Sequence, residues 1–600
     1  MSRGGRMGWG LVGLAAVVAV TAVGLHPGGS LPEREFPPLP AGVAVSGQPP
    51  GQYGGVLVLS NAGEPTGFNP LVIEDADSAE ISRLMFTGLT TVDPVTQETV
   101  PALAESWEIG DDLKTYTFRL REGVRWSDGE PITADDVIFT FEAVFDPETP
   151  NRYSQQYTIA GERIGVEKLD ALTVRFVTPD LYAPFLNDVG FIPILPKHKL
   201  GKALREGRLA QAWTIQTGMA NPEELVSSGP FRLLSYRPGD RLLLIPNPHY
   251  WKADSLGQRL PYVDLVVVKF VKDSNAELVL FATGQTDISG IPGPDVTWVR
   301  RGEETYDFTI YDQGPSTSIS FIFFNQHPGR NERGEPFVPP HKLAWFTDRR
   351  FRQAISHGFD REGIVQGVFF GRATPLHSII GPGNLRWHNP NTTQFNYDPE
   401  RARELLAEAG FKRDPNQGPL RDREGNEVEF EVLVPAASAT SPQIITSFAE
   451  NMKDLGIRVR LTTIDFGTMI ARTSQTFNYE AGIMGFTGGG DPSGGKAIYR
   501  SDGRLHLWHP GQESPATEWE ARIDQIMDLS ERTFDYAERK ELIDELQEIF
   551  AVERPLIFLV TPNAYLGIKN KWQNLFKDAR GRTVYEMESL WTSESPGLAR

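Results

Sequence analysis

The sequence predicts an α/β protein with more than one domain, and two observations carry that prediction. With 600 residues the chain is too long for a single core, and 40% hydrophobic residues, including 10% aromatic ones, are enough to build several. In the second half, strand patterns alternate with helix patterns: residues 429–435 predict a strand, 447–455 a helix and 458–464 another strand. This βαβ succession is typical of a parallel sheet covered by helices.

Residues 116–147, YTFRLREGVRWSDGEPITADDVIFTFEAVFDP, predict a strand, a turn and a helix. Tyr116, Phe118 and Leu120 alternate with polar residues, as in a half-buried strand. The turn follows in the Ser-Asp-Gly-Glu-Pro segment at 127–131. Thr133, with an aspartate three residues later, forms a capping box ahead of apolar residues at helical spacing, so a helix begins there.

The composition excludes several kinds of protein. A formal net charge of −19, from 59 basic and 78 acidic residues, argues against a nucleic-acid partner, because such binding depends on Lys and Arg at the phosphates. The chain has no cysteine. Disulfides, thiolate metal sites, a cysteine nucleophile and a lipid-modified cysteine are therefore excluded, and no cofactor is expected.

The N-terminus predicts export. Arg3 and Arg6 precede an apolar run, so residues 1–25 form either a cleaved signal peptide or a retained N-terminal anchor. Residues 26–52 are rich in Pro and Gly and predict an extended linker without packing. Any membrane association is expected through the N-terminus alone.

Several motifs resemble those of one family. They are Arg-Glu-Gly-Val-Arg-Trp-Ser-Asp-Gly-Glu-Pro-Ile-Thr-Ala-Asp-Asp-Val at 121–137, Phe-Thr-Gly-Leu at 86–89, Asn-Pro-His-Tyr-Trp at 247–251 and Asp-Arg-Arg-Phe-Arg-Gln-Ala-Ile at 348–355. Together they resemble the family 5 extracellular solute-binding proteins, the receptors for oligopeptides, dipeptides, nickel and some oligosaccharides that feed ABC importers. The resemblance spans roughly residues 53–566.

The resemblance implies a two-lobed, periplasmic-binding-protein-like α/β fold of type II, with an extra domain on the first lobe and a ligand cleft between the lobes. The expected boundaries are 53–91 for the first part of lobe I, 92–226 for the extra domain, 227–310 for the second part of lobe I, 311–555 for lobe II and 556–600 for the return to lobe I and the tail. The charged run from 348 to 364 is expected to be a solvated helix face with mutually paired charges.

The implied function is an extracytoplasmic, monomeric receptor that captures an oligopeptide or similar extended solute and delivers it to the permease subunits of an ABC importer. An oligosaccharide receptor of the same family is the alternative. A secreted hydrolase is the alternative of another class. The chain has no G-x-S-x-G elbow and no H-E-x-x-H motif, although a pair of catalytic carboxylates stays open.

The glycine-rich residues 479–508 are the predicted ligand-contacting stretch, because glycine lets the backbone approach a ligand closely. The resemblance places the Asp491-Pro492 pair in the cleft. Peptide receptors of the family carry an acidic residue shortly before this pair, whereas Gly488, Gly489 and Gly490 stand there here. Candidate residues from this stretch are Phe486, Gly488, Gly489, Gly490, Asp491, Tyr499 and Trp508, whose aromatic members form either a ligand platform or ordinary core.

Further candidates come from the first lobe and from the start of the second. In peptide-binding relatives the residues that match Ala79, Glu80 and Ser82 offer backbone groups to an extended ligand; a plain first turn of a helix is the alternative. Asn69, in the segment leading to this helix, and Asn325, after the strand that opens lobe II, complete the set. If a ligand ammonium needs an acidic partner, the first candidates are Glu74, Asp75, Glu80 and Asp491.

Two other motifs are discounted. Residues 490–496 nearly fit a phosphate-binding loop, but Ala497 stands where a hydroxyl must reach magnesium. His506 and His509 lack carboxylate neighbours at helical spacing, so no metal site is predicted.

Overall fold

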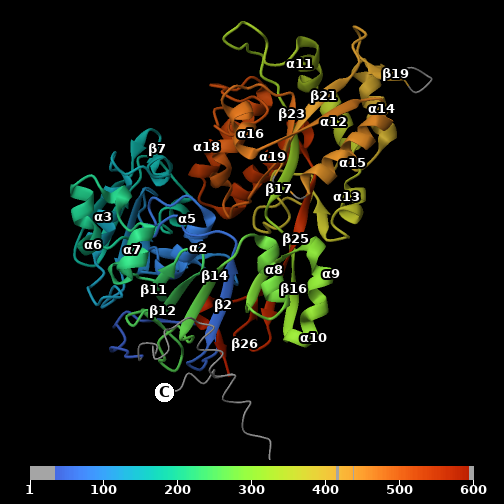
Figure 1. The fold of residues 1–600 in the computed structure, drawn as a ribbon. Coiled ribbons are helices and arrows are strands. Elements are labelled where there is room, and N and C mark those ends of the chain that lie inside the picture. Colours follow the sequence, from blue (N-terminus) through green and yellow to red (C-terminus); the bar gives the residue numbers. More distant parts are fainter. Residues whose placement is uncertain (1–33, 414–417, 437, 439, 594–600) are drawn as a thin grey trace, which may run out of the picture. The chain divides into compact units, whose positions relative to one another are not determined.

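The computed structural model describes residues 34–413, 418–436, 438 and 440–593. The predicted signal peptide or anchor at 1–25 lies outside these residues. The described chain forms two compact units: unit 1 contains the residues up to Ile291, Thr297–Tyr311 and those from Leu566 onward, and unit 2 contains Pro292–Val296 and Asp312–Tyr565 (Figure 1). None of the helices within the described ranges combines the length and the apolarity that crossing a membrane requires.

Unit 1 is built on two four-stranded sheets. One has the order β11-β12-β14-β2, in which β2 runs parallel to β14 and the other neighbours are antiparallel. The other has the order β5-β6-β10-β9 and is antiparallel throughout. Their strands are β2 (Val56–Asn61), β5 (Ala104–Ile109), β6 (Thr115–Leu120), β9 (Gly165–Lys168), β10 (Thr173–Val177), β11 (Phe231–Arg237), β12 (Arg241–Pro246) and β14 (Leu265–Phe270).

The strand, turn and helix predicted at 116–147 are confirmed. β6 is followed by a turn in which Gly129 has a φ of +93°, and α3 (Ala134–Val144) follows. The Asp136 carboxylate accepts a hydrogen bond from the Thr133 amide at 2.9 Å, which is one arm of the expected capping box. The remaining longer helices of unit 1 are α2 (Ala76–Met85), α6 (Lys197–Arg205) and α8 (Ser274–Ala282).

The predicted linker is packed against unit 1 from residue 34 onward, so the expectation of a free spacer is wrong for this part. Arg34 pairs with Asp264 at 2.9 Å and donates to the Pro261 carbonyl at 3.0 Å. Arg259 donates to the carbonyls of Pro37 and Pro38, and β1 (Ala44–Val45) pairs with β13 (Lys252–Ala253). Composition suggested an unpacked linker, but the prolines leave carbonyls that buried guanidinium groups can use.

Unit 2 is a five-stranded mixed sheet with helices on both faces, in the order β22-β21-β23-β17-β24 (Figure 1). β21 runs parallel to β22 and β23, which confirms the predicted βαβ succession. The strands are β17 (Ile319–Phe324), β21 (Glu429–Pro435), β22 (Arg458–Ile464), β23 (Ala481–Phe486) and β24 (Leu556–Phe558). The longer helices are α11 (Pro340–Thr347), α12 (Arg349–His357), α13 (Arg361–Gly367), α14 (Pro399–Glu408), α15 (Ser441–Asp454), α16 (Phe466–Ser474), α18 (Glu518–Arg532) and α19 (Tyr536–Glu553).

Alternation along β17 divides the core of unit 2 into two clusters. Ile322 and Phe324 join the cluster that contains residues of α12, α14 and α15, whereas Phe321 and Phe323 join the one that contains residues of α18 and α19. Because successive strand side chains point to opposite faces, one apolar strand supplies both cores.

The boundary at which the chain returns to unit 1 differs from the prediction. The chain passes from unit 1 to unit 2 within β16 (Phe308–Pro315) and returns within β25 (Val560–Lys569), so unit 2 ends at Tyr565 and not at 555. β24 belongs to unit 2 because it pairs with β17. Residues 92–226 lie inside unit 1, and a separate extra domain stays a prediction.

The charged run at 348–364 is only partly a solvated face. Arg350 pairs with Asp348 at 2.7 Å near the surface, as expected. Arg352 and Arg361, however, are buried, with 2% and 3% of their surfaces exposed. A charge pattern read along the sequence does not reveal which guanidinium groups find carbonyl acceptors inside.

Candidate functional site

Unit 2 contains a cavity of about 150 Å³ beside the predicted glycine-rich stretch. Its apolar lining comes from Ile319, Ile379, Ile380, Phe486, Ile498 and Tyr499. Gly488, Gly489, Asp491 and Gly495 also line it, so five of the seven candidates from this stretch meet at one place. Apolar cavities of this size hold a group as large as benzene, which is about one medium-sized side chain.

β23 positions the first of these residues. Phe486 is its last residue, and its ring packs against Phe321 of β17 with ring centres 5.1 Å apart. The glycines follow directly. A Cβ added to Gly488 would lie 2.0 Å from the Thr317 carbonyl oxygen, so only glycine fits there; at Gly490 an added Cβ would meet open space.

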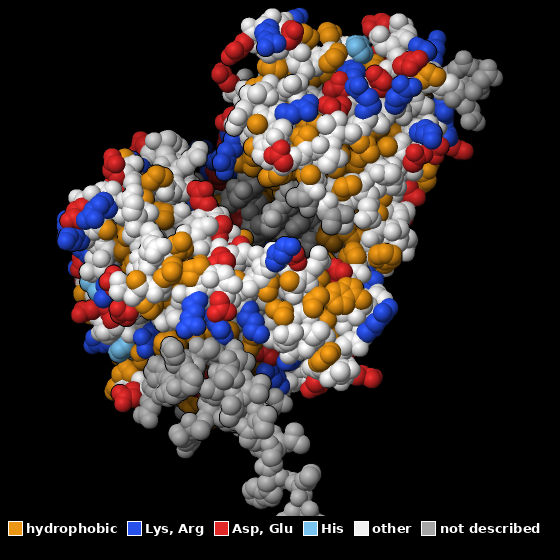
Figure 2. All heavy atoms as spheres, in the orientation of Figure 1, with side chains coloured by type: hydrophobic (Ala, Val, Ile, Leu, Met, Phe, Trp, Pro, Cys, Tyr) orange, Lys and Arg blue, Asp and Glu red, His pale blue; other side chains and the backbone are white. Residues whose placement is uncertain are grey.

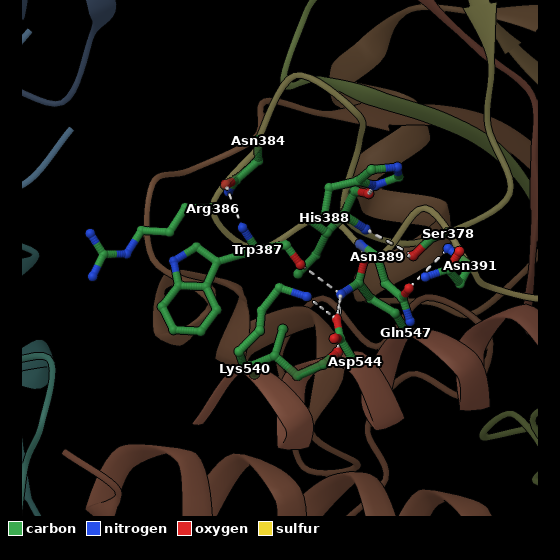
Figure 3. Close-up of polar contacts among 12 residues, drawn as sticks. Ser378, Asn384, Arg386, Trp387, His388, Asn389, Asn391, Lys540, Asp544 and Gln547 are labelled. Atoms are coloured by element: carbon green, nitrogen blue, oxygen red, sulfur yellow. Dashed lines mark hydrogen bonds and ion pairs between the residues drawn. The ribbon is translucent and has the colours of Figure 1, made fainter. Parts of the chain in front are cut away.

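Asn384 holds the glycine loop from the other side. Its Nδ2 donates to the carbonyls of Gly489 and Gly490, both at 3.0 Å, and its Oδ1 accepts from the Trp387 amide. Figure 3 shows Asn384 on the loop that lies against α19. Sequence reasoning missed Asn384, because an asparagine in a loop gives no signal of which carbonyls it reaches.

Gln547 of α19 forms hydrogen bonds with the backbone of the loop that contains Asn384. Its Nε2 donates to the Trp387 carbonyl at 2.8 Å, and its Oε1 accepts from the Asn389 amide at 2.9 Å (Figure 3). Gln547 is fully buried. A buried amide that satisfies loop backbone at both ends makes the wall of the cavity rigid.

Asp491 is not a free ligand-binding acid, which corrects the prediction for it. Both of its oxygens accept from Arg539, at 2.6 and 2.7 Å, and one also accepts from the Ser493 amide and hydroxyl. Burial raises the pKa of Asp491, but the hydrogen bonds and charge of Arg539 together with the hydrogen bonds from Ser493 hold that pKa below its ordinary value. Arg539 also lies over the Trp387 ring, 4.9 Å from its centre.

The predicted aromatic platform does not form. Trp508 is 1% exposed, and its Nε1 donates to Glu520 at 3.1 Å. Tyr499 forms a wall of the cavity and packs against Phe550. Of the three candidate aromatic residues, Phe486 alone is partly exposed at the cavity. The core alternative is therefore correct for Trp508, because helices α18 and α19 cover it.

Two candidate asparagines have structural roles. Asn325 is fully buried and donates to the carbonyls of Phe477 and Tyr479, both at 3.0 Å. Asn69 is 1% exposed and donates to the Leu209 carbonyl at 2.9 Å. The prediction that they contact a ligand is wrong as far as their side chains are concerned, because both amides are already used inside their units.

In unit 1, Ala79, Glu80 and Ser82 all lie within α2. The Ala79 amide donates to the Asp75 carbonyl, and the Ser82 carbonyl accepts from the Phe86 amide. The helix already uses these groups, which favours the alternative of a plain helical turn, and ligand contact by this segment stays a prediction. Glu80 is exposed, and Ser82 is buried beside a second cavity, of about 1040 Å³, that lies within unit 1.

Of the acids considered as ammonium partners, Asp75 is also engaged. It caps α2 by accepting from the Ser78 amide and hydroxyl, both at 2.7 Å. Glu74 and Glu80 are exposed.

Residues of the two discounted motifs have partners within unit 2. Lys496, the lysine of the loop-like segment, pairs with Glu531 at 2.9 Å instead of facing a phosphate site. His506 is buried against Trp508, and its Nε2 lies 3.3 Å from Glu520. Among the described residues, no group of three or more potential ligands could hold a metal ion.

The face visible in Figure 2 shows Lys and Arg interspersed with Asp and Glu, without a basic patch of the kind that polyanions need. The mixed sheets and the two compact units agree with the predicted two-lobed α/β fold class.

Comparison with known proteins identifies the family. The family model described as bacterial extracellular solute-binding proteins, family 5, middle part, matches residues 98–503, and the chain belongs to this family. A relative in Deinococcus radiodurans, named a probable ABC transporter-binding protein, is 28% identical over 547 residues, which cover 87% of this chain and 89% of the relative. The oligopeptide-binding protein AppA of Bacillus subtilis is 25% identical, with 90% of this chain and 92% of AppA covered.

One solved structure of similar fold contains an oligosaccharide and not a peptide. The periplasmic binding protein MelB of Agrobacterium fabrum, in complex with stachyose, matches with a TM-score of 0.70 and 22% identity, over 92% of this chain and 86% of MelB.

Proposed function

We propose that this protein is an extracytoplasmic receptor that captures an oligopeptide and delivers it to the permease subunits of an ABC importer, acting as a monomer and without enzymatic activity. Family membership and the names of its relatives support transport of a solute, and the name of AppA supports a peptide. The cavity in unit 2 would take one uncharged side chain of that peptide.

The observation that carries this proposal is the chemistry of the cavity. Its walls are mostly isoleucine and aromatic rings, and Asp491 is the one carboxylate among the described residues that line it. Since Arg539 neutralises Asp491, a charged group entering the cavity would lose its hydration without gaining a partner. An apolar or neutral group enters without that cost.

An oligosaccharide is the second candidate, because the glycines at 488–490 leave no acid for a ligand ammonium and the fold accommodates stachyose in MelB. Calorimetric titration of one peptide with free and acetylated N-termini, beside a panel of oligosaccharides, separates the two. We expect acetylation to change the affinity little. Loss of binding on acetylation would mean that an acidic residue outside the glycine stretch binds the ligand ammonium, and Glu74 and Glu80 would be the first candidates.

The cavity itself is tested by filling it. Ile498→Phe places a larger side chain at the cavity and is expected to weaken peptide binding at least tenfold. Ile470→Phe is the matched control, because Ile470 contacts the same core but does not line the cavity. Equal affinities in both variants would remove the cavity from the binding site.

Enzymatic activity is tested in the same samples. A receptor returns its peptide or sugar unchanged, so mass spectrometry after overnight incubation should find only intact ligand. Hydrolysis products that depend on the protein would favour the hydrolase alternative.

A further inference from the structure

Unit 2 buries three arginines that form no ion pair with any described carboxylate: Arg352, Arg361 and Arg554, with at most 3% of each exposed. A guanidinium group stays charged at any pH that a protein tolerates. Burying such a charge is costly unless its donors are satisfied by hydrogen bonds. The three residues differ in how far this condition is met.

Arg352 and Arg361 are satisfied by carbonyl groups. Arg361 donates four hydrogen bonds of 2.8 to 3.0 Å, to the carbonyls of Phe558, Ser356 and Phe395 and to the Ser356 hydroxyl. Arg352 donates twice to the Glu553 carbonyl and once to that of Phe346, at 2.8 to 3.0 Å. In these two residues the buried guanidinium group forms three or four hydrogen bonds of normal length.

The guanidinium group of Arg554 forms far fewer hydrogen bonds. The residue follows α19 in the left-handed conformation, with a φ of +51°, and its guanidinium stacks 4.1 Å from the centre of the Phe395 ring. Its one hydrogen bond runs from Nη1 to the His377 carbonyl and is long, at 3.4 Å. Nε and Nη2 are buried and have no acceptor among the described residues.

The two unsatisfied donors belong together. Nε–H and the adjacent Nη2–H are parallel and form the fork with which arginine binds an anion in a bidentate manner. Nδ1 of His377 is likewise buried without a partner, in the residue whose carbonyl accepts the one bond of Arg554. Three unsatisfied ring or guanidinium nitrogens thus come from two residues in direct contact.

The local electrostatics favour a negative occupant. Burial and then the neighbouring Arg361 lower the pKa of Arg554, and burial with both arginines lowers the pKa of His377 to about 3, so this ring is neutral and can donate from Nδ1. Glu548 is the acid that acts on Arg554, but its carboxylate already accepts from the Thr393 amide at 2.8 Å and from the Thr393 hydroxyl. A water molecule would accept hydrogen bonds from these donors but leave the positive charge of Arg554 unneutralised. An anion would accept the hydrogen bonds and also neutralise the charge.

We propose that the Nε and Nη2 donors of Arg554, with Nδ1 of His377, bind a small monovalent anion of the halide class inside unit 2. The anion neutralises a cation at the junction of α19 and β24 and so stabilises this end of the sheet. The proposal is independent of the solute that the protein carries.

The test uses the whole chain and bromide as the probe. Thermal and urea unfolding are followed at constant ionic strength while gluconate is replaced by bromide. At bromide concentrations far above half-saturation, each tenfold rise in bromide should raise the folded-to-unfolded ratio about tenfold, because the ion binds the folded state alone. Anomalous diffraction from bromide-grown crystals should show a peak beside Arg554.

Variants exclude general salt effects. Arg554→Met should abolish the bromide dependence, whereas Arg401→Met, at an exposed arginine of α14, should keep it. If Arg554→Met does not fold, the anomalous peak in the unaltered protein decides. A site without anomalous signal together with no bromide dependence would mean that water alone occupies it, and would overturn the proposal.

Discussion

At the scale of single residues, the Asp491–Arg539 pair links the candidate site to the stability of unit 2. Both side chains are at most 8% exposed, and their closest atoms lie 2.6 Å apart. Asp491→Ala leaves Arg539 charged and buried, so we expect a loss of roughly 3–5 kcal/mol in the free energy of unfolding. Urea denaturation measures it.

Two controls accompany this variant. The double variant Asp491→Ala with Arg539→Met removes both charges and should be more stable than the single one. Glu404→Ala breaks the exposed pair with Arg401 and should cost less than about 1 kcal/mol. If the single and double variants were equally unstable, the loss would come from packing and not from an unpaired charge.

Glu520 gives unit 2 an acid-sensitive element. Burial raises its pKa, but hydrogen bonds from His506, Trp508 and Thr517 overcome burial and lower the pKa from 4.5 to about 2. A carboxyl with a lowered folded pKa stabilises the fold above its unfolded pKa, and this contribution is lost as the pH falls from about 4.5 to 2. The lowering corresponds to about 3 kcal/mol at neutral pH.

We therefore expect Glu520→Gln to be less stable than the unaltered protein at pH 7 and to lose less stability on acidification to pH 3. Chemical unfolding at a series of pH values measures both effects. Parallel pH profiles for the two proteins would show that Glu520 does not control this window.

At the scale of elements, the loop after β23 has two glycines with opposite surroundings. Gly488→Ala forces a Cβ against the Thr317 carbonyl, so we expect the loop to shift, with a loss of about 1–3 kcal/mol and weaker ligand binding. Gly490→Ala meets open space and should keep the stability. Melting temperatures and ligand titrations of both variants check this, and equal losses would contradict the close approach at Gly488.

The segment at 34–52 shows how an element without regular structure becomes part of a domain. Arg34 and Arg259 each bind backbone carbonyls across more than 200 residues of sequence. These hydrogen bonds use the carbonyl groups of prolines, whose nitrogen atoms have no hydrogen to donate. The described part of the predicted linker, from residue 34 onward, therefore belongs to unit 1.

At the scale of the whole molecule, the two units offer different candidates to the ligand. In unit 2, five predicted residues line the cavity of about 150 Å³. In unit 1, the predicted residues of α2 are the half-buried Ala79, the exposed Glu80 and the buried Ser82, which borders the cavity of about 1040 Å³. Hydrogen exchange with and without a bound peptide tests the candidate residues of both units in one experiment. We expect protection of the amides at 486–499, because contact with a ligand reduces local opening.

Strand β12 at the centre of its sheet in unit 1 serves as the internal reference and should not change. Protection confined to unit 1 would contradict the cavity in unit 2 as a ligand site.

The sequence by itself determined the elements whose signals are local. Asp398 caps the start of α14 and Gly410, with a positive φ, follows its end; both signals act within a few residues. The same holds for α18 and α19, which begin after Thr517 and Asp535. The motifs at 121–137 and 348–355 were long enough to give the family and, through it, the fold class.

Only the tertiary structure decided which side chains are free. Trp508, Asn325, Asn69 and Asp491 have suitable chemistry for a ligand, yet each is satisfied by a partner distant in sequence. Asn384, Gln547 and Arg539, which shape the cavity, act on residues 48 to 160 positions away. A hydrogen bond depends on distance in space, and the sequence pattern around a residue does not contain that distance.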